Sequence, residues 1–169
     1  MALGLFGLSG KGRAGGLAAG DPAPAFELVD QEGETHRLAD YRGRWLVVYF
    51  YPRDDTPGCT TEACRFRDDL PRLRQLGAQV LGVSLDSPES HAAFAAEYHL
   101  PFPLLADRDG EAARAYGAYF GLGPLRFAKR HTFIVDPAGR IARIFRSVKP
   151  ASHSDRVVAA VAELREGTG

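Results

Sequence analysis

Hydrophobic residues in this chain of 169 residues follow two different patterns, continuous runs and a helical spacing of three and four. Short, nearly continuous apolar runs rich in β-branched and aromatic side chains are typical of strands buried on both faces of a sheet. Such runs occur in "RWLVVYFY" (44–51), "AQVLGVSL" (78–85) and "FPLLAD" (102–107). Two further pairs of runs flank the turn sequences "DQEG" and "PAGR", which predicts hairpins over 25–38 and 131–146.

Apolar residues spaced three and four apart predict helices between these strands. The first helix begins at about Thr60 and places Phe66, Leu70 and Leu73 on one face. The other helices are predicted over 86–100, 110–119 and 154–167. Strands that alternate with helices, followed by a late hairpin, predict an α/β fold in which helices flank a central mixed sheet.

Composition places the chain among ordinary globular proteins, with 45% hydrophobic and 25% charged residues. Its 21 basic and 21 acidic residues give a formal net charge of zero, which argues against nucleic-acid binding. The sequence offers no apolar run that could span a bilayer, so no membrane partner is expected. The start of the chain is rich in glycine and lacks the basic first residues of a signal peptide. We therefore expect a cytoplasmic protein with a flexible N-terminal extension over 1–19 and a single domain over 20–169.

Both cysteines of the chain, Cys59 and Cys64, lie in "YPRDDTPGCTTEAC" (51–64). A permanent structural disulfide is not expected in a reducing cytoplasm, so two neighbouring thiols indicate metal binding or redox chemistry. A structural zinc site needs a second pair of ligands, and the five histidines show no paired spacing. A C-x-x-C redox motif is absent as well. Either cysteine can also be a small buried hydrophobe, and this interpretation stays open at this stage.

The position of Cys59 favours a chemical role. A buried strand ends at about Tyr51, turn residues follow, and Cys59 falls in the first turn of the next helix. In α/β proteins, functional sites form beyond the carboxyl ends of strands. The unpaired amides and the positive end of the dipole at a helix N-terminus favour the thiolate, which is the nucleophilic form of cysteine. The sequence therefore predicts an activated cysteine at this place.

The segment "YPRDDTPGCTTEACRFRD" (51–68) resembles the active-site segment of peroxiredoxins, which reads Pro-x-x-x-Thr-x-x-Cys. Pro52, Thr56 and Cys59 fit this spacing without a gap. A second cysteine five residues further on, Cys64, is similar to the pattern of the bacterioferritin comigratory protein or peroxiredoxin Q subfamily. The likeness extends from about residue 20 to the end of the chain.

This resemblance implies a thioredoxin-like fold and an enzyme that reduces hydrogen peroxide and organic hydroperoxides without a metal or a bound cofactor. Cys59 would attack the peroxide and become a sulfenic acid. Cys64 would resolve it as an intramolecular disulfide, and thioredoxin or a similar dithiol would recycle the enzyme. The alternative from another class is a non-enzymatic, peroxide-sensing thiol switch that relays its oxidation state to a partner protein.

The resemblance also assigns roles to other residues near the sulfur. Thr56 would form a hydrogen bond to the thiolate and the peroxide through its hydroxyl, and Pro52 would cover the sulfur and limit the access of water. Arg130, which comes just before "TFIVD", would hold Cys59 as a thiolate. For Glu62 we expect a solvent-facing charge on the helix. For His153, near the last helix, we expect a structural role.

Two expectations follow from the rest of the pattern. The glycine-rich segment 116–130 looks shorter than in the familiar subfamily members, and its aromatic residues would line the pocket mouth or a dimer surface, or belong to the core. The segment leaves the oligomeric state open, and we expect a monomer or a weak homodimer. On one helix, a separation of five residues would place the two cysteine Cα atoms about 8.6 Å apart. A disulfide needs Cα atoms within roughly 7 Å. The first turns of this helix should therefore unwind before Cys64 can reach Cys59.

Overall fold

The computed structural model describes residues 16–167 of the chain. Most of the expected N-terminal extension, residues 1–15, lies outside the described residues. Contacts with the body of the protein begin at Leu17, whose side chain packs against the hydrophobic core and whose carbonyl accepts a hydrogen bond from Arg146. No helix within residues 16–167 is long and apolar enough to cross a membrane.

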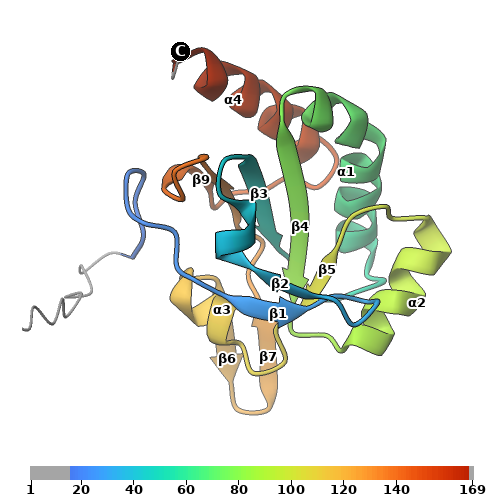
Figure 1. Cartoon of the computed structure of the whole chain (residues 1–169). Coiled ribbons are helices and arrows are strands. Elements are labelled where there is room, and N and C mark those ends of the chain that lie inside the picture. The colour runs from blue at the N-terminus through green and yellow to red at the C-terminus, as the bar shows by residue number, and fades with distance from the viewer. Residues whose placement is uncertain (1–15, 168–169) are drawn as a thin grey trace, which may run out of the picture.

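The centre of the fold is a five-stranded mixed sheet with the strand order β5-β4-β3-β8-β9 (Figure 1). The strands β3, β4 and β5 pair in parallel, whereas β8 and β9 pair antiparallel to their neighbours. Their bounds are Trp45–Phe50 for β3, Ala78–Ser84 for β4, Leu104–Ala106 for β5, Thr132–Val135 for β8 and Ile141–Phe145 for β9. This arrangement confirms the predicted α/β fold with a central mixed sheet.

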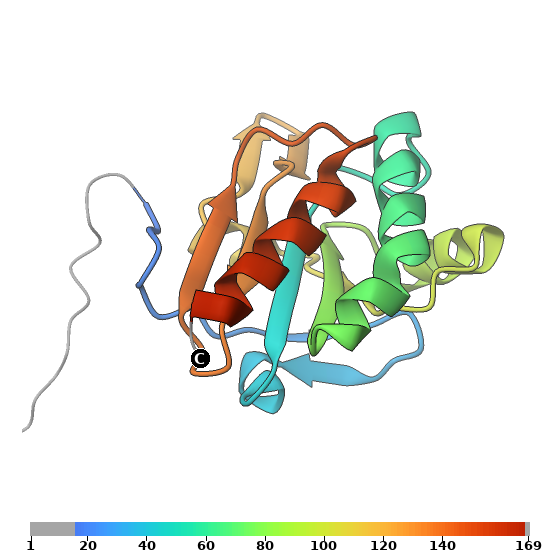
Figure 2. The same ribbon diagram turned by 90° about the horizontal axis from the view of Figure 1, so that it is seen from above.

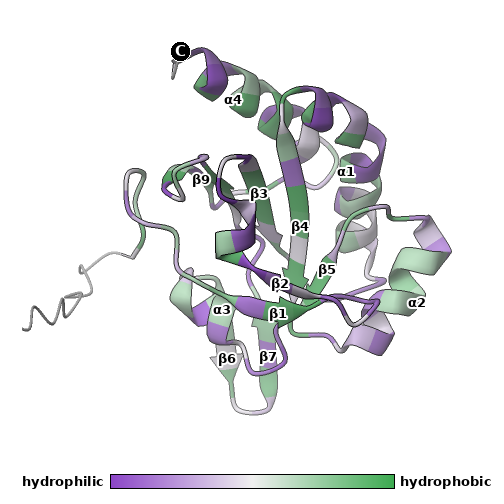
Figure 3. Cartoon of the chain, viewed as in Figure 1, coloured by the Kyte–Doolittle hydropathy of each residue, from purple (hydrophilic) through white to green (hydrophobic). Residues whose placement is uncertain are grey.

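Side chains of the central strand β3 are buried on both faces of the sheet, which explains its continuous apolar sequence. Val47 and Tyr49 belong to the core cluster that α1 and α4 cover. Val48 and Phe50 point into the opposite cluster, which the N-terminal segment and α3 cover. Figure 2 shows α1 and α4 side by side over one face of the sheet. In Figure 3, β4 is coloured mainly as hydrophobic, whereas α1 and α4 carry both hydrophobic and hydrophilic residues.

Four α-helices complete the described part of the chain, close to where the sequence predicts them, except that the helix predicted over 110–119 ends at Ala115. Their bounds are Pro57–Gln75 for α1, Pro88–Tyr98 for α2, Glu111–Ala115 for α3 and His153–Gly167 for α4. The helix α1 begins three residues before the expected start at Thr60, because Pro57 is suited to the first helical position, where its missing amide N–H costs no bond. Cys59 is therefore the third residue of the helix.

Three smaller elements surround this core. The predicted first hairpin is present as β1 (Glu27–Val29) and β2 (Thr35–Arg37), and a short 3-10 helix, η1 (Leu38–Tyr41), follows it. A second hairpin, β6 (Tyr119–Leu122) and β7 (Leu125–Ala128), projects beside α3 and is not predicted by the sequence analysis (Figure 1). Its rings Phe120 and Phe127 stack on each other, while Tyr116 before it is buried in the core.

Candidate active site

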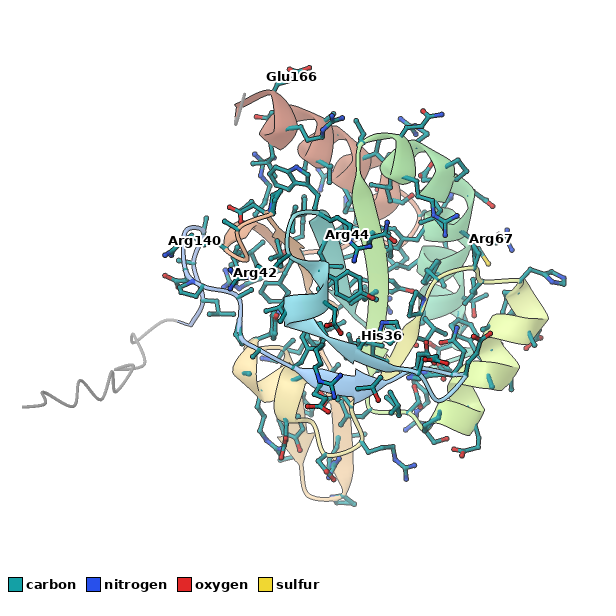
Figure 4. The ribbon with its side chains drawn as sticks, viewed as in Figure 1. His36, Arg42, Arg44, Arg67, Arg140 and Glu166 are labelled. Atoms are coloured by element: carbon teal, nitrogen blue, oxygen red, sulfur yellow. The ribbon has the colours of Figure 1, made fainter. Side chains whose placement is uncertain are left out.

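The loop that precedes α1 leaves the carboxyl end of the central strand β3 and turns sharply at Asp55. Asp55 has a φ of 57°, a left-handed conformation that aspartate tolerates better than most residues. Its carboxylate accepts a hydrogen bond from the Tyr98 hydroxyl at the end of α2. Arg67, labelled on α1 in Figure 4, donates a hydrogen bond to the carbonyl of the same tyrosine. The loop, the start of α1 and the end of α2 are thus tied together.

Cys59 is buried at the N-terminus of α1, with 1% of its surface exposed. A residue at the third helical position has a backbone amide without an intrahelical acceptor, and the positive end of the helix dipole lies beside its side chain. Both features favour a thiolate over a thiol. The structure therefore places Cys59 where the sequence predicts it, in the first turn of a helix beyond the sheet.

Arg130 brings a permanent positive charge to this sulfur. It lies just before β8, and its Nη2 donates a hydrogen bond to the Cys59 Sγ at 3.3 Å. Burial acts to lower the pKa of Arg130, but the charges of Cys59 and Glu62 outweigh burial, so its pKa is raised. A guanidinium in this place remains charged and offers a fixed partner to a negatively charged sulfur.

Gly58 provides the space in which the guanidinium lies. A Cβ atom at this position would be 3.1 Å from Nη2 of Arg130 and 3.6 Å from Pro150. The absence of a side chain at Gly58 thus allows Arg130 to approach the first turn of α1 closely. This role of Gly58 was not found from the sequence.

Glu62 is not the solvent-facing charge expected from the sequence. Its side chain is fully buried, and its Oε1 accepts a hydrogen bond of 3.1 Å from Nη1 of Arg130. Its other oxygen, Oε2, has no hydrogen-bond partner among the described residues. Burial raises the pKa of Glu62 from 4.5 to about 7, although the charge of Arg130 opposes this rise. The expectation is wrong because Arg130, 68 residues away in the sequence, covers this face of the helix.

The other predicted residues lie close to Cys59 in the chain but make different contacts. Thr56 lies at the N-cap position of α1 without a side-chain hydrogen bond to the helix, and its hydroxyl donates a hydrogen bond to the carbonyl of Arg53. Pro52 is half-buried in the loop between β3 and α1. Cys64 lies in the same unbroken helix as Cys59, is half-buried, and carries a free thiol.

His153 lies at the start of α4. Its ring is buried, bonds to the Thr132 hydroxyl through Nε2, and packs edge-on against Phe66 and Phe145. Burial, aided by the charges of Arg156 and Arg130, lowers the pKa of His153 from 6.5 to about 4. The imidazole is therefore neutral at pH 7, in keeping with the expected structural role.

A buried polar network fixes the active-site loop to α2, and the sequence analysis did not find it. The carboxylate of Asp54 accepts hydrogen bonds from Tyr51 and Ser90 and contacts Nδ1 of His91 at 2.7 Å. The other ring nitrogen of His91 contacts the carbonyl of Leu105 at 3.0 Å. No local pattern could have identified this pair, since Asp54 and His91 are 37 residues apart.

The same network contains the group of side chains, within the described residues, whose spacing fits a metal ion. Donor atoms of Asp54, Asp86 and His91 lie within 4.8 Å of one another. The carboxylate of Asp86 already accepts hydrogen bonds from Ser84 and the Asp54 amide. Because these donor atoms are engaged in hydrogen bonds, an ion could bind here only by breaking the contacts that hold the loop.

One surface cavity of the protein lies away from Cys59. It has a volume of about 640 Å³ and lies between the N-terminal hairpin and α3, lined by Phe26, Leu28, Leu38 and Ala112, among others. Cavity size thus does not mark the reactive sulfur. A sulfur as deeply buried as that of Cys59 suits a small substrate.

Comparison with known proteins gives consistent results. The model of the AhpC/TSA family matches residues 19–144. Peroxiredoxin Bcp of Bacillus subtilis is 40% identical over 155 residues, which cover 89% of this chain and 98% of the relative. Peroxiredoxin Bcp of Escherichia coli is 40% identical over 149 residues, which cover 84% of this chain and 94% of the relative. A structure of peroxiredoxin Q from Xanthomonas campestris superposes with a TM-score of 0.81 at 37% identity, covering 87% of this chain and 98% of that one.

Proposed function

Because the chain belongs to the AhpC/TSA family, with peroxiredoxins of the Bcp and Q types as relatives, it is a thiol peroxidase, and we propose that Cys59 attacks the peroxide. Its fold is thioredoxin-like, as in those relatives. The observation that carries the proposal is the hydrogen bond of 3.3 Å between the buried Cys59 sulfur and Arg130 at a helix N-terminus.

The chemical step is a nucleophilic displacement on oxygen. The Cys59 thiolate donates an electron pair to one peroxide oxygen, the S–O bond forms, and the O–O bond breaks. Cys59 becomes a sulfenic acid, and the departing oxygen takes up a proton to leave as water or an alcohol. The guanidinium of Arg130 stabilises the thiolate before the reaction and the negative charge that develops on the departing oxygen.

Thr56 and Pro52 would shape the pocket in which the peroxide is held. The Thr56 hydroxyl gives its proton to the Arg53 carbonyl, so its oxygen is free to accept a hydrogen bond from a peroxide hydroxyl. Pro52 would shield the sulfur from water, and its place in the loop just before α1 supports this role. A positioned acceptor and a partly dry pocket both favour the displacement.

Cys64 would resolve the sulfenic acid as an intramolecular disulfide. Because α1 is one helix from Pro57 to Gln75, the two cysteine Cα atoms are about 8.6 Å apart by helix geometry. This distance exceeds the roughly 7 Å that a disulfide allows, so the first turns of α1 must open before the bond forms. A fully folded state would react with peroxide, and an opened state would present the disulfide to thioredoxin or a similar dithiol reductant.

Hydrogen peroxide and organic hydroperoxides are the substrates that fit a buried, small site, and the enzyme would act without a bound cofactor. Two free thiols support a reducing compartment such as the cytoplasm. We propose that the protein works as a monomer or a weak homodimer.

Turnover separates this enzyme from a peroxide-sensing thiol switch. With a thioredoxin system as reductant, the protein should consume many equivalents of hydrogen peroxide, cumene hydroperoxide and tert-butyl hydroperoxide per Cys59. Consumption that stops after about one equivalent, with reductant still present, would favour the sensor. Replacing thioredoxin with glutaredoxin or dithiothreitol in the same assay identifies the reductant that supports the fastest turnover.

A further inference from the structure

Glu62 is a buried carboxyl group that the displacement described above does not use. Its two oxygens have unequal surroundings: Oε1 accepts a hydrogen bond from Arg130, and Oε2 is buried with no partner among the described residues. A carboxylate with one oxygen in such a place loses hydration that nothing replaces. The protonated form therefore suits the site better, in agreement with a pKa raised to about 7.

The charges near Glu62 also favour its protonated form while Cys59 is a thiolate. One guanidinium, that of Arg130, serves both groups, with Nη2 on the Cys59 sulfur and Nη1 on the Glu62 carboxyl. The Cys59 thiolate already balances the single positive charge of Arg130. A second negative charge in the same buried place would be repelled by the first, so a protonated Glu62 accompanies the thiolate.

Two other titratable groups on this side of the sheet stay neutral at pH 7. Tyr49 of β3 is fully buried, and burial together with the charge of Glu62 raises its pKa well above 10. His153 of α4, which packs edge-on against Phe66 of α1, has a pKa lowered to about 4 and carries no charge at pH 7. Arg130 is thus the charge that decides the state of Glu62.

We propose that Glu62 is the proton source for peroxide cleavage: it gives up its proton as Cys59 loses its negative charge, so that Arg130 always faces one anion. This inference rests on the proposed roles of Cys59 and Arg130. The step balances as follows: the thiolate, the protonated Glu62 and the peroxide become the sulfenic acid, the Glu62 carboxylate and an alcohol or water. The electron pair leaves sulfur, the proton leaves Glu62, and one negative charge passes from Cys59 to Glu62. When a dithiol reductant restores the thiolate, Glu62 takes up a proton again.

Counting protons tests this proposal directly. In a Cys64→Ser background the reaction stops at the sulfenic acid, and a pH indicator in weak buffer reports protons taken from solvent. Near pH 7, close to the pKa of Glu62, where loss of the thiolate charge changes its protonation most, one equivalent of hydrogen peroxide should cause clearly less than one proton to be taken up per Cys59. With Glu62→Gln added, uptake should rise to about one, because glutamine has no proton to give. A Glu163→Gln control, which alters an exposed glutamate paired with Arg143, should behave like the background protein.

Equal proton uptake with and without Glu62→Gln, whatever its value, would overturn the proposal. Mass spectrometry of each sample shows whether a sulfenic acid forms at Cys59, so failure of the proposed peroxidase mechanism remains distinguishable from failure of the proton donor. Oxidised-minus-reduced infrared spectra of the Cys64→Ser protein provide a second test that needs no change at Glu62. The carbonyl band of a protonated carboxylic acid should disappear on oxidation, and its persistence would contradict the proposal.

A change of leaving group separates proton donation from mere positioning of Arg130. Hydrogen peroxide expels hydroxide, a strong base that needs a proton to leave, whereas peracetic acid expels a carboxylate, a weak base that leaves without one. General acid catalysis contributes about a hundredfold or more, so Glu62→Gln should slow the reaction with hydrogen peroxide at least tenfold more than the reaction with peracetic acid. An equal loss with both oxidants would make Glu62 a positioning residue only.

Discussion

Replacing Glu62 with glutamine should change how the free energy of unfolding depends on pH. Burial raises the pKa of Glu62 from 4.5 to about 7 in the folded protein. Between these two values the folded state keeps a proton that the unfolded state releases, so wild-type stability falls as pH rises from about 4.5 to about 7. Below this window both states hold the proton, and above it neither does.

The size of the effect follows from the same two values. One pKa unit corresponds to about 1.4 kcal/mol, so the rise from 4.5 to about 7 is worth about 3 kcal/mol. Glutamine has the shape of glutamic acid and can still accept the hydrogen bond from Arg130, but it does not titrate. The variant should therefore gain about 3 kcal/mol relative to wild type between pH 4 and pH 8.

Urea unfolding of the reduced proteins at several pH values between 4 and 8 measures this difference. His153, whose lowered pKa makes stability fall with falling pH below about 6.5, is present in both proteins and cancels from the comparison. The exposed Glu163→Gln variant, which lacks a buried carboxyl, should track wild type at every pH. A difference between Glu62→Gln and wild type that stays constant over this range would refute a buried, protonated Glu62.

Three further variants test neighbouring parts of the site. Arg130→Ala should move the alkylation of Cys59 to higher pH, because the sulfur loses a cation 3.3 Å away, and an unchanged alkylation profile would contradict the electrostatic role. Gly58→Ala should leave stability intact but slow the peroxide reaction, because the added Cβ would crowd Nη2 of Arg130 at 3.1 Å; a wild-type rate constant in stopped flow would show that this space is unimportant. Cys64→Ser should keep the first peroxide reaction fast and leave Cys59 open to oxidation to a sulfinic acid, seen by mass spectrometry; resistance to further peroxide would argue against a resolving role.

The central sheet could be predicted from sequence because its strands are buried on both faces. Continuous apolar runs such as 44–51 then carry a strong local signal. The hairpin of β6 and β7 was missed because much of it is exposed, including Leu122 and Leu125 beside the turn, so its sequence lacks the pattern of a buried strand. The hairpin turns at Gly123, whose φ is 56°. Because the surrounding segment contains other glycines, Gly123 does not stand out in the sequence as a turn signal.

In the site, too, local sequence identified some residues, whereas the roles of others depend on contacts between distant parts of the chain. Cys59 could be recognised from its place after a strand and at a helix start, together with the spacing to Thr56 and Pro52. Arg130 came only from the resemblance, since arginines are common in this chain and its contact with the sulfur spans 71 residues. The burial of Glu62 depends on that same arginine, so no local pattern could reveal it.

The reaction of single-cysteine proteins with peroxide tests the central claim most directly. One equivalent of hydrogen peroxide is mixed with reduced Cys64→Ser or Cys59→Ser protein, and the loss of thiol is followed by stopped flow and mass spectrometry. We expect Cys59 to be oxidised far faster than a free cysteine, whereas Cys64 alone reacts no faster than a free thiol. Fast oxidation of Cys64 in the Cys59→Ser protein, or slow oxidation of Cys59, would contradict the assignment of Cys59 as the residue that attacks the peroxide.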